Sequence, residues 1–397
     1  MLRFALFIVI AVGIVAGLHH YLWLRLVRDT ALAGGVRTAA TAAICGLGAA
    51  LPVSVFVGRA LPWPGARIVL WPIYVWMGLM FLVFFLLLAV DATRLVGWAL
   101  GQVLPPIKPS FDPGRRIALA RLTGGGAALV ASALGAVATR DAARAVGVQS
   151  VRVRLARLPR SMHGTTIVQL TDLHVGSLQG QEFVERVVAR VNALEPDVVV
   201  ITGDLIDGTV ERLREAVAPI GRLVAKHGVF FVTGNHEYYV SNDQVSGWRE
   251  WAEELARLGV RVLHNERVSI GQSDAGFDLA GVPDWSARAY GADHAPDLGR
   301  ALAGRDRARA VVLLAHQPKA IHESARHGVD LQLSGHTHGG QIWPWRYLVR
   351  LDQPFVSGLG RVGDTRIYVS RGAGTWGPPM RLGEPAEITR VVLESDA

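Results

Sequence analysis

Side chains that can bind a metal ion occur in five short blocks between residues 172 and 338. Imidazole, carboxylate and amide groups suit divalent transition metals such as Mn, Fe, Zn or Ni, and the pattern does not choose among them. The single cysteine, Cys45, lies in an apolar run, which excludes a cysteine-based metal site and an internal disulfide framework. The blocks are Asp172 with His174, Asp204, Asn235 with His236, His316, and His336 with His338.

Each block directly follows a short apolar run that we predict to be a β-strand. Apolar residues at helical spacing lie between several of these runs, which indicates an α/β fold. In open α/β sheets, ligands bind beyond the carboxyl ends of the strands, so the five blocks can converge on one cleft. Gly203, Gly234 and Gly335 each precede a metal-capable residue, where we expect a sharp turn of the backbone. The runs are 167–170, 198–201, 229–232, 311–314 and 331–333.

A set of ligands of this kind fits two-metal hydrolysis of a phosphoester. Two divalent ions about 3.5 to 4 Å apart can hold the attacking and the leaving oxygen of an in-line displacement, and a water bound between them loses its proton near neutral pH. A carboxylate shared by the two ions is the natural bridge.

The blocks Asp-X-His, Gly-Asp, Gly-Asn-His and Gly-His-X-His, in this order, resemble the calcineurin-like metallophosphoesterase superfamily over residues 151 to 395. The apolar N-terminal region and the run 335–344, GHTHGGQIWP, are similar to its membrane-associated YkuE/YaeI-like branch. The resemblance implies an α/β fold, a four-layer αββα sandwich of two mixed sheets flanked by helices, with a dinuclear metal centre.

The resemblance also implies roles for individual residues. His236 would stabilise the transition state or protonate the leaving oxygen, which suits an imidazole. Asp207 either orients His236 or is a solvated or capping carboxylate. The first ion would be held by Asp172, His174, Asp204 and His338, and the second by Asp204, Asn235, His316 and His336, so that Asp204 bridges.

The first 140 residues are expected to form a transmembrane helical region ahead of a phosphoesterase domain at 151–397. A bilayer core about 30 Å thick requires roughly 20 apolar residues in a helix. Three charge-free stretches meet this requirement, and a fourth contains Arg121 and three consecutive glycines. The alternative for the fourth is a buried hairpin of the soluble domain. The four stretches are 4–24, 39–57, 68–90 and 117–138.

The formal net charge of +8 comes almost entirely from arginine. On a membrane protein this favours anionic headgroups as partners, and we expect no nucleic acid partner because no aromatic-interleaved basic motif is present. With four spans, the flanking arginines tilt the positive-inside rule toward an extracytoplasmic catalytic domain of a multi-pass protein in the inner or plasma membrane. Three spans would reverse this orientation.

Several aromatic residues lie near the motifs. Trp343, Trp345 and Trp376 occur in glycine- and proline-rich loops, where they either contact a pocket or a membrane, or cover the edge of the sandwich. Tyr238 and Tyr239 follow the Asn-His block, where flanking the substrate and ordinary packing are both open.

We therefore expect a membrane-anchored, dinuclear metal-dependent phosphoesterase, with a phosphodiester favoured over a phosphomonoester and a lipid or cell-envelope substrate. A nuclease that uses the same site, a non-catalytic metal-binding membrane receptor and a transport protein are the alternatives. The complete ligand set and His236 argue against a receptor. The predicted spans contain one charged residue, Arg121, which argues against a transporter.

Overall fold

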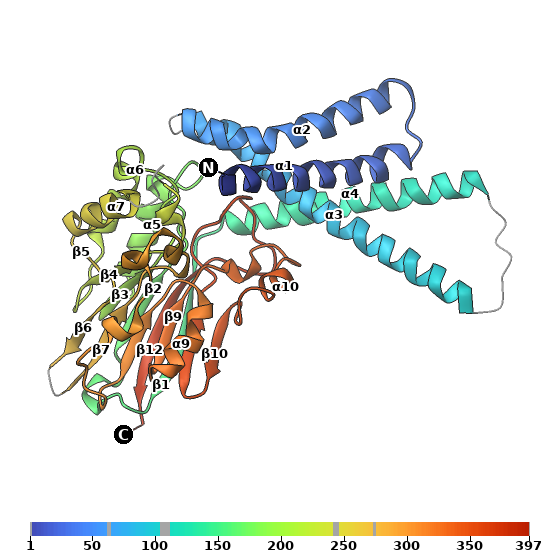
Figure 1. Cartoon of the computed structure of the whole chain (residues 1–397). Coiled ribbons are helices and arrows are strands. Elements are labelled where there is room, and N and C mark those ends of the chain that lie inside the picture. Colours follow the sequence, from blue (N-terminus) through green and yellow to red (C-terminus); the bar gives the residue numbers. More distant parts are fainter. Residues whose placement is uncertain (1, 62–64, 104–111, 241–245, 273–274, 397) are drawn as a thin grey trace. The chain divides into compact units, whose positions relative to one another are not determined.

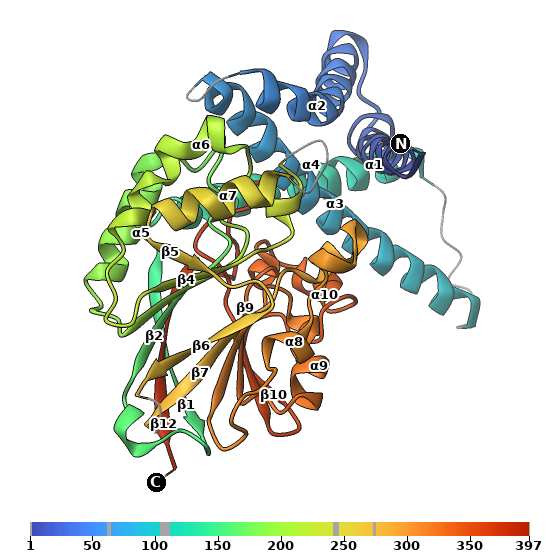
Figure 2. The same cartoon turned by 60° about the vertical axis from the view of Figure 1, so that its left-hand side comes forward.

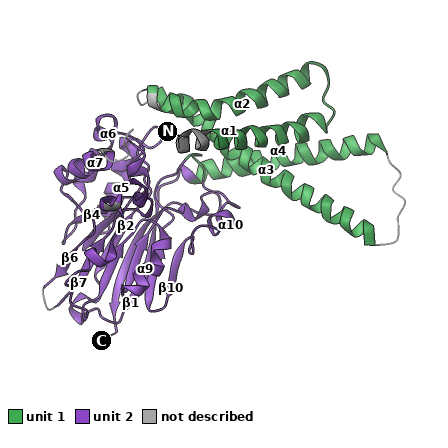
Figure 3. Ribbon diagram, viewed as in Figure 1, with its two compact units in different colours: residues 1–141, 377–380 green, residues 142–376, 381–397 purple. Residues whose placement is uncertain are grey.

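The computed structural model describes residues 2–61, 65–103, 112–240, 246–272 and 275–396. Two compact units are distinguished in Figure 3. Unit 1 comprises Met1–Asp141 and Gly377–Met380, and unit 2 comprises Ala142–Trp376 and Arg381–Ala397.

Unit 1 is built from long apolar helices (Figure 1). Within the described residues, four helices are long and apolar enough to cross a membrane. The region predicted as the fourth span forms one continuous helix rather than a hairpin. The helices are α1 (Leu2–Trp23), which continues into a π-helical turn at Leu24–Arg28, α2 (Gly34–Ala60), α3 (Gly65–Val103) and α4 (Pro113–Ala142).

All four helices extend beyond the predicted span ends and thereby include further charged residues. The hydroxyl of Tyr21 donates to Asp91 Oδ2 at 2.7 Å, and Arg25 bonds to Asp91 and, at 2.8 Å, to Asp29. Arg121 Nε donates to the carbonyl of Thr30 at 2.9 Å. Arg121 is the only charged residue inside the four predicted spans, and the other charges lie beyond the ends of those spans. Pairing of opposite charges explains how the longer helices accommodate them.

Unit 2 contains two six-stranded mixed sheets. In the first sheet, β12 and β2 are antiparallel and all other neighbours are parallel. In the second, the two edge pairs are antiparallel and the inner pairs are parallel. The first sheet has the order β1 (Gly147–Leu155), β12 (Glu387–Ser395), β2 (Thr166–Leu170), β3 (Val198–Thr202), β4 (Val229–Val232), β5 (Val260–Val262). The second has the order β10 (Gly358–Val362), β11 (Thr365–Val369), β9 (Leu331–Ser334), β8 (Val311–Leu314), β7 (Gly276–Gly281), β6 (Glu266–Gly271).

The two sheets pack against each other, and helices cover their outer faces (Figures 1 and 2). Strand β3 shows why the strands are apolar throughout: Val198 and Val200 enter the core between the sheets, whereas Val199 and Ile201 face the helical layer. The four-layer α/β fold is confirmed. The covering helices are α5 (Gln181–Asn192), α6 (Val210–Val217) and α7 (Ser246–Arg257) on the first sheet, and α8 (Leu298–Ala301) and α9 (Ile321–Arg326) on the second.

The five strands predicted to end in metal-capable residues are present, but they belong to different sheets. Strands β2, β3 and β4 lie side by side in the first sheet, and β8 and β9 lie side by side in the second. The blocks that follow them meet because the two sheets are stacked with these strand ends at the same edge.

Candidate metal centre

Six of the seven predicted metal ligands come together in two groups. Within each group, one candidate ligand atom of every member lies within 4.8 Å of those of the others. Each group combines residues that follow strands of both sheets. One group is Asp172, His174 and His338, and the other is Asp204, His316 and His336.

Most of these residues adopt a left-handed backbone conformation. The φ angles are 55° for Asp172, 48° for His174, 51° for Asp204, 71° for His336 and 50° for His338. Residues other than glycine seldom adopt this region, and each instance costs on the order of 1 to 3 kcal/mol. The strain is held by the packed strand ends, and its concentration at one place indicates a functional site.

We expected sharp backbone turns at the three motif glycines, but their main effect is to let the backbone approach neighbouring side chains closely. Of the three, Gly203 has a left-handed φ of +91°. A Cβ on Gly234 would lie 2.2 Å from Asp204 Oδ1, and one on Gly335 would lie 2.3 Å from Asp172 Oδ2. The backbone of one strand end thus packs directly against a carboxylate from another.

Pairs of imidazole nitrogens face each other in both groups. His174 Nε2 lies 3.0 Å from His338 Nε2, and His316 Nε2 lies 3.2 Å from His336 Nδ1. Two nitrogens that bind one ion at about 2.1 Å each, at angles between 90° and tetrahedral, are separated by roughly 3.0 to 3.4 Å. Asp204 Oδ2 is also 3.2 Å from His316 Nε2. The observed spacings therefore fit ligands of a shared cation.

Hydrogen bonds orient two of these rings. His316 Nδ1 lies 2.7 Å from the carbonyl of Thr202, and since a carbonyl only accepts, Nδ1 carries the proton. His174 Nδ1 lies 3.0 Å from Asp207 Oδ1 and donates to it in the same way. Nδ1 of each ring is thereby held by an acceptor and Nε2 is directed into the site, the arrangement found around metal-bound histidines.

Asp204 lies between the two groups. Its Oδ2 is 3.2 Å from His316 Nε2 in one group and 3.9 Å from His174 Nε2 in the other. Its Oδ1 accepts the backbone N–H of His236 at 2.9 Å. The shared carboxylate predicted from the sequence is therefore in a position to contact both groups.

Asn235, the seventh predicted ligand, is buried, and its Oδ1 has no hydrogen-bond partner in the described part of the chain. A buried amide oxygen without a partner costs about 1 to 3 kcal/mol. A cation would satisfy it, because amide oxygens are ordinary metal ligands.

The charges of the site act on its titratable groups. Burial raises the pKa of Asp204, but the neighbouring His316 and His236 outweigh it and hold this pKa well below the usual range. Burial and the charge of His316 lower the pKa of His336 to about 3. Burial, His174 and Arg381 likewise lower the pKa of His338. The last two rings are thus neutral, which metal binding requires.

His236 lies at the edge of the two groups with its side chain 13% exposed. Its Nδ1 donates to Asp207 Oδ1 at 2.6 Å, so that Asp207 bonds to His236 and His174 together. Burial lowers the pKa of His236, but Asp204 and Asp207 raise it to about 9. Of the two readings of Asp207, this geometry supports the one in which it orients His236. The rings of Tyr239 and Trp376 lie 5.3 and 5.7 Å from the His236 ring.

Glu237 is a buried residue of this region that the sequence reasoning missed. Its carboxylate accepts the backbone N–H groups of Gly234 at 2.6 Å, Asp204 at 3.0 Å and Leu205 at 2.8 Å. Burial and the charge of Asp204 raise the pKa of Glu237 to about 7. The sequence feature that could have indicated Glu237 is its position directly after the Asn-His block. Glu237 ties the β3 and β4 strand ends together.

Asp284 and Arg381 were also missed. Asp284 is buried shortly after β7, where both of its carboxylate oxygens accept from Gln317, the residue after His316, at 2.9 and 3.0 Å. Arg381 is 1% exposed, and its guanidinium approaches His338 Nδ1 at 3.4 Å. It donates to the backbone carbonyls of Arg371, Gly372, Gly374 and Glu384.

Most of unit 2 is similar in sequence to known proteins. Residues 165–340 match the family described as calcineurin-like phosphoesterase. A transmembrane protein with metallophosphoesterase domain from Bos taurus is 41% identical over 315 residues, which are 77% of this chain and 68% of that protein. A metallophosphoesterase of Aquifex aeolicus is 33% identical over 62% of this chain and 91% of its own length. The Bacillus subtilis metallophosphoesterase YkuE is 28% identical over 61% of this chain and 84% of its own.

Proposed function

Because this chain belongs to the calcineurin-like metallophosphoesterase family, we propose that it hydrolyses phosphoesters, phosphodiesters in preference to phosphomonoesters. The resemblance to this superfamily expected from the motifs is confirmed, and YkuE is among the relatives. In the proposed centre, two divalent ions are bound by Asp172, His174, Asp204, Asn235, His316, His336 and His338.

The position of Asp204 carries the proposal. Its Oδ2 approaches imidazole nitrogens of both ligand groups, at 3.2 and 3.9 Å. A carboxylate so placed can hold two cations at the separation that phosphoryl transfer requires. A single structural metal ion would not require imidazole ligands on both sides of the Asp204 carboxylate.

The bound ions would supply a nucleophilic water-derived oxygen and neutralise charge on the phosphoryl group. The protein's own contribution centres on His236. Because Nδ1 is bonded to Asp207, Nε2 is the atom that can face the substrate. With its pKa raised to about 9, His236 carries a proton at neutral pH that it can donate to the leaving oxygen.

The substrate class and the orientation in the membrane are further parts of this proposal. We infer a lipid or cell-envelope phosphoester, because the chain has four helices able to cross a membrane and its bovine relative is named a transmembrane protein. The arginine distribution supports a catalytic domain on the extracytoplasmic side of the inner or plasma membrane. External protease on intact cells should then cleave unit 2, and cleavage only after lysis would reject this orientation.

The catalytic proposal is tested with the purified full chain in detergent, loaded with Mn²⁺. We expect it to hydrolyse a chromogenic phosphodiester faster than the matching monoester. Asp204→Asn should abolish turnover and lower the bound metal, whereas His236→Ala should lower kcat about 10²- to 10⁴-fold and retain the metal. The control is Asp364→Asn at an exposed site. Metal-independent turnover, or full activity of Asp204→Asn, would reject the proposal.

A further inference from the structure

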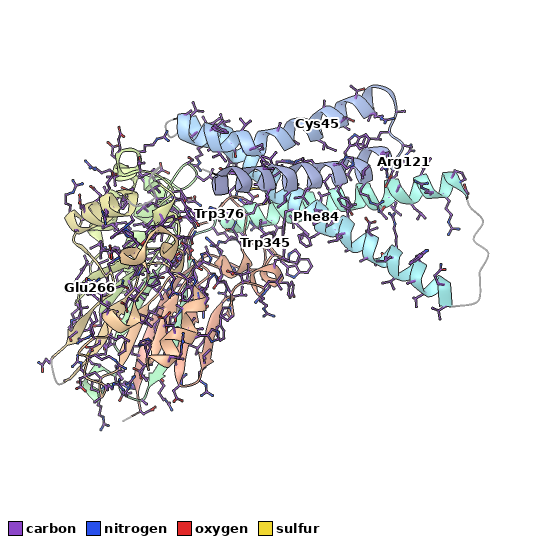
Figure 4. All side chains as sticks on the ribbon, in the orientation of Figure 1. Cys45, Phe84, Arg121, Glu266, Trp345 and Trp376 are labelled. Carbon is purple, nitrogen blue, oxygen red and sulfur yellow. The ribbon has the colours of Figure 1, made fainter. Side chains whose placement is uncertain are left out.

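Unit 2 presents a cluster of exposed aromatic and aliphatic side chains on residues 343 to 351, here called the 343–351 segment. Trp343 is 51% exposed, Trp345 46%, Tyr347 56% and Leu351 84%. The short helix α10 (Arg346–Val349) within it has no buried residue. A soluble surface seldom concentrates large apolar side chains in this way, and such a patch marks a binding surface. Figure 4 labels Trp345 at this segment.

The exposure does not result from a loose loop, because hydrogen bonds fix the backbone of the segment. The N–H of Trp343 donates to the carbonyl of Leu382 at 3.0 Å, and that of Trp345 to Ile342 at 2.9 Å. The Arg346 guanidinium bonds to the buried Glu384 at 2.6 Å. The apolar side chains are therefore held outward by the fold.

The charges of the segment complement an anionic surface. Arg350 is exposed between the apolar side chains. Asp352, the acidic residue that follows Leu351, is paired with Lys319 Nζ at 3.1 Å. Tryptophan, tyrosine and arginine together are typical of the boundary between lipid headgroups and acyl chains, where amphipathic rings are stable and cations are attracted to anionic lipids.

The sequence supplies a reason to choose a lipid surface over a protein partner. Helix α4 is long and apolar enough to cross a membrane, and residues 143–146 alone separate it from β1 of unit 2. A tether of this length keeps a bilayer at high effective concentration near unit 2. An apolar patch on a tethered domain meets lipid far more often than it meets a free protein.

We propose that the 343–351 segment docks unit 2 onto the membrane, with Trp343, Trp345 and Leu351 at the headgroup–acyl boundary and Arg350 among anionic headgroups. This docking goes beyond the proposed hydrolysis and does not require it. It is therefore measurable in a variant without bound metal, and its failure would leave the catalytic proposal intact.

The test places a nitroxide spin label on the full chain in a Cys45→Ser background, reconstituted into phosphatidylcholine vesicles that contain phosphatidylglycerol. The labelled position is Leu351→Cys, and the matched control is Val224→Cys, another exposed aliphatic residue of unit 2, 67% exposed. We expect the label at 351 to collide more often with oxygen than with a water-soluble nickel chelate, and the label at 224 to show the reverse.

Three outcomes would overturn the proposal: a water-like label at 351, a label shielded from both reagents by protein, or spin–spin broadening from a second copy. The electrostatic part is tested by Arg350→Glu, which should make the label at 351 shallower in vesicles with phosphatidylglycerol and leave it unchanged in pure phosphatidylcholine. If the label at 351 lies at the same depth with and without Arg350→Glu in both vesicle types, the role of Arg350 is rejected.

Discussion

Glu237 and Arg381 are buried ionisable groups that fix the backbone around the proposed metal ligands without belonging to the ligand set. Glu237 joins the backbone before Asn235 to the backbone of Asp204. The Arg381 guanidinium donates hydrogen bonds to backbone carbonyls of the 371–374 loop. The N–H of Gly374 in this loop donates to the carbonyl of Asp172 at 2.9 Å. Each charge is satisfied by backbone groups, so neither can be replaced without leaving buried donors or acceptors unpaired.

For Glu237→Gln we expect a loss of stability of about 1 to 3 kcal/mol, because the amide nitrogen would face backbone N–H groups that need an acceptor. The loss is measured by urea unfolding of the full chain, followed by tryptophan fluorescence. Glu185→Gln is the control, since Glu185 makes an exposed ion pair with Arg222. Equal stability of the two variants would contradict the role assigned to Glu237.

For Arg381→Lys we expect weaker metal binding with the charge conserved. A lysine ammonium has three donors at one point and cannot reach the four carbonyl-bearing residues that the guanidinium joins. Loss of a partner that supports a metal ligand weakens metal affinity about 10- to 100-fold. Competition with a fluorescent chelator measures this affinity, with the exposed Arg361→Lys as the control. An unchanged affinity would show that Arg381 acts only on stability.

At the scale of elements, the site depends on how closely the strand ends approach one another. Gly234 belongs to the end of β4, yet its Cα lies against the Asp204 carboxylate that follows β3. Gly335 follows β9 in the second sheet and abuts Thr171 and Asp172 after β2 in the first. At Gly335 the two sheets are therefore joined by a backbone-to-carboxylate contact that has no room for a side chain.

Gly335→Ala should consequently separate the two sheets locally. Its Cβ would lie 2.2 Å from Thr171 Oγ1 and 2.3 Å from Asp172 Oδ2, so one of the strand ends must move. We expect bound metal and turnover to fall together, measured by elemental analysis and the chromogenic assay. Gly147→Ala is the control, because its nearest neighbour would be an ordinary 3.5 Å contact. Retention of both metal ions by Gly335→Ala would contradict this account.

At the scale of the whole molecule, metal binding and folding of unit 2 should be coupled. The ligands come from distant parts of the chain and gather only in the folded state, so ions that bind them stabilise that state by mass action. At a free concentration of 100 times Kd the stabilisation is about 2.7 kcal/mol per site.

Removal of metal with EDTA should therefore lower the midpoint of thermal unfolding of the full chain, and added Mn²⁺ should restore it. Differential scanning fluorimetry follows the change through the tryptophans. Asp204→Asn should respond much less, because the bridging charge is missing. A shift of equal size in Asp204→Asn would mean that the ions act elsewhere on the protein.

The sequence by itself determined the family, the candidate ligands and the order of the elements. A metal-capable residue directly after an apolar run is local information, and so are the apolar stretches long enough to cross a bilayer. These features predict the α/β layers and identify Asp172, Asp204 and the late histidines as candidate metal ligands.

The tertiary structure alone decided which strand ends face one another. Strands β2 to β4 and β8 to β9 belong to separate sheets, so the meeting of Asp204 with His316 depends on sheet packing that no local pattern encodes. Glu237, Asp284 and Arg381 acquire their roles in the same way, because a buried charge is defined by partners far away in the chain. The left-handed backbone of Asp204 likewise exists only because the packed strands hold it against its intrinsic preference.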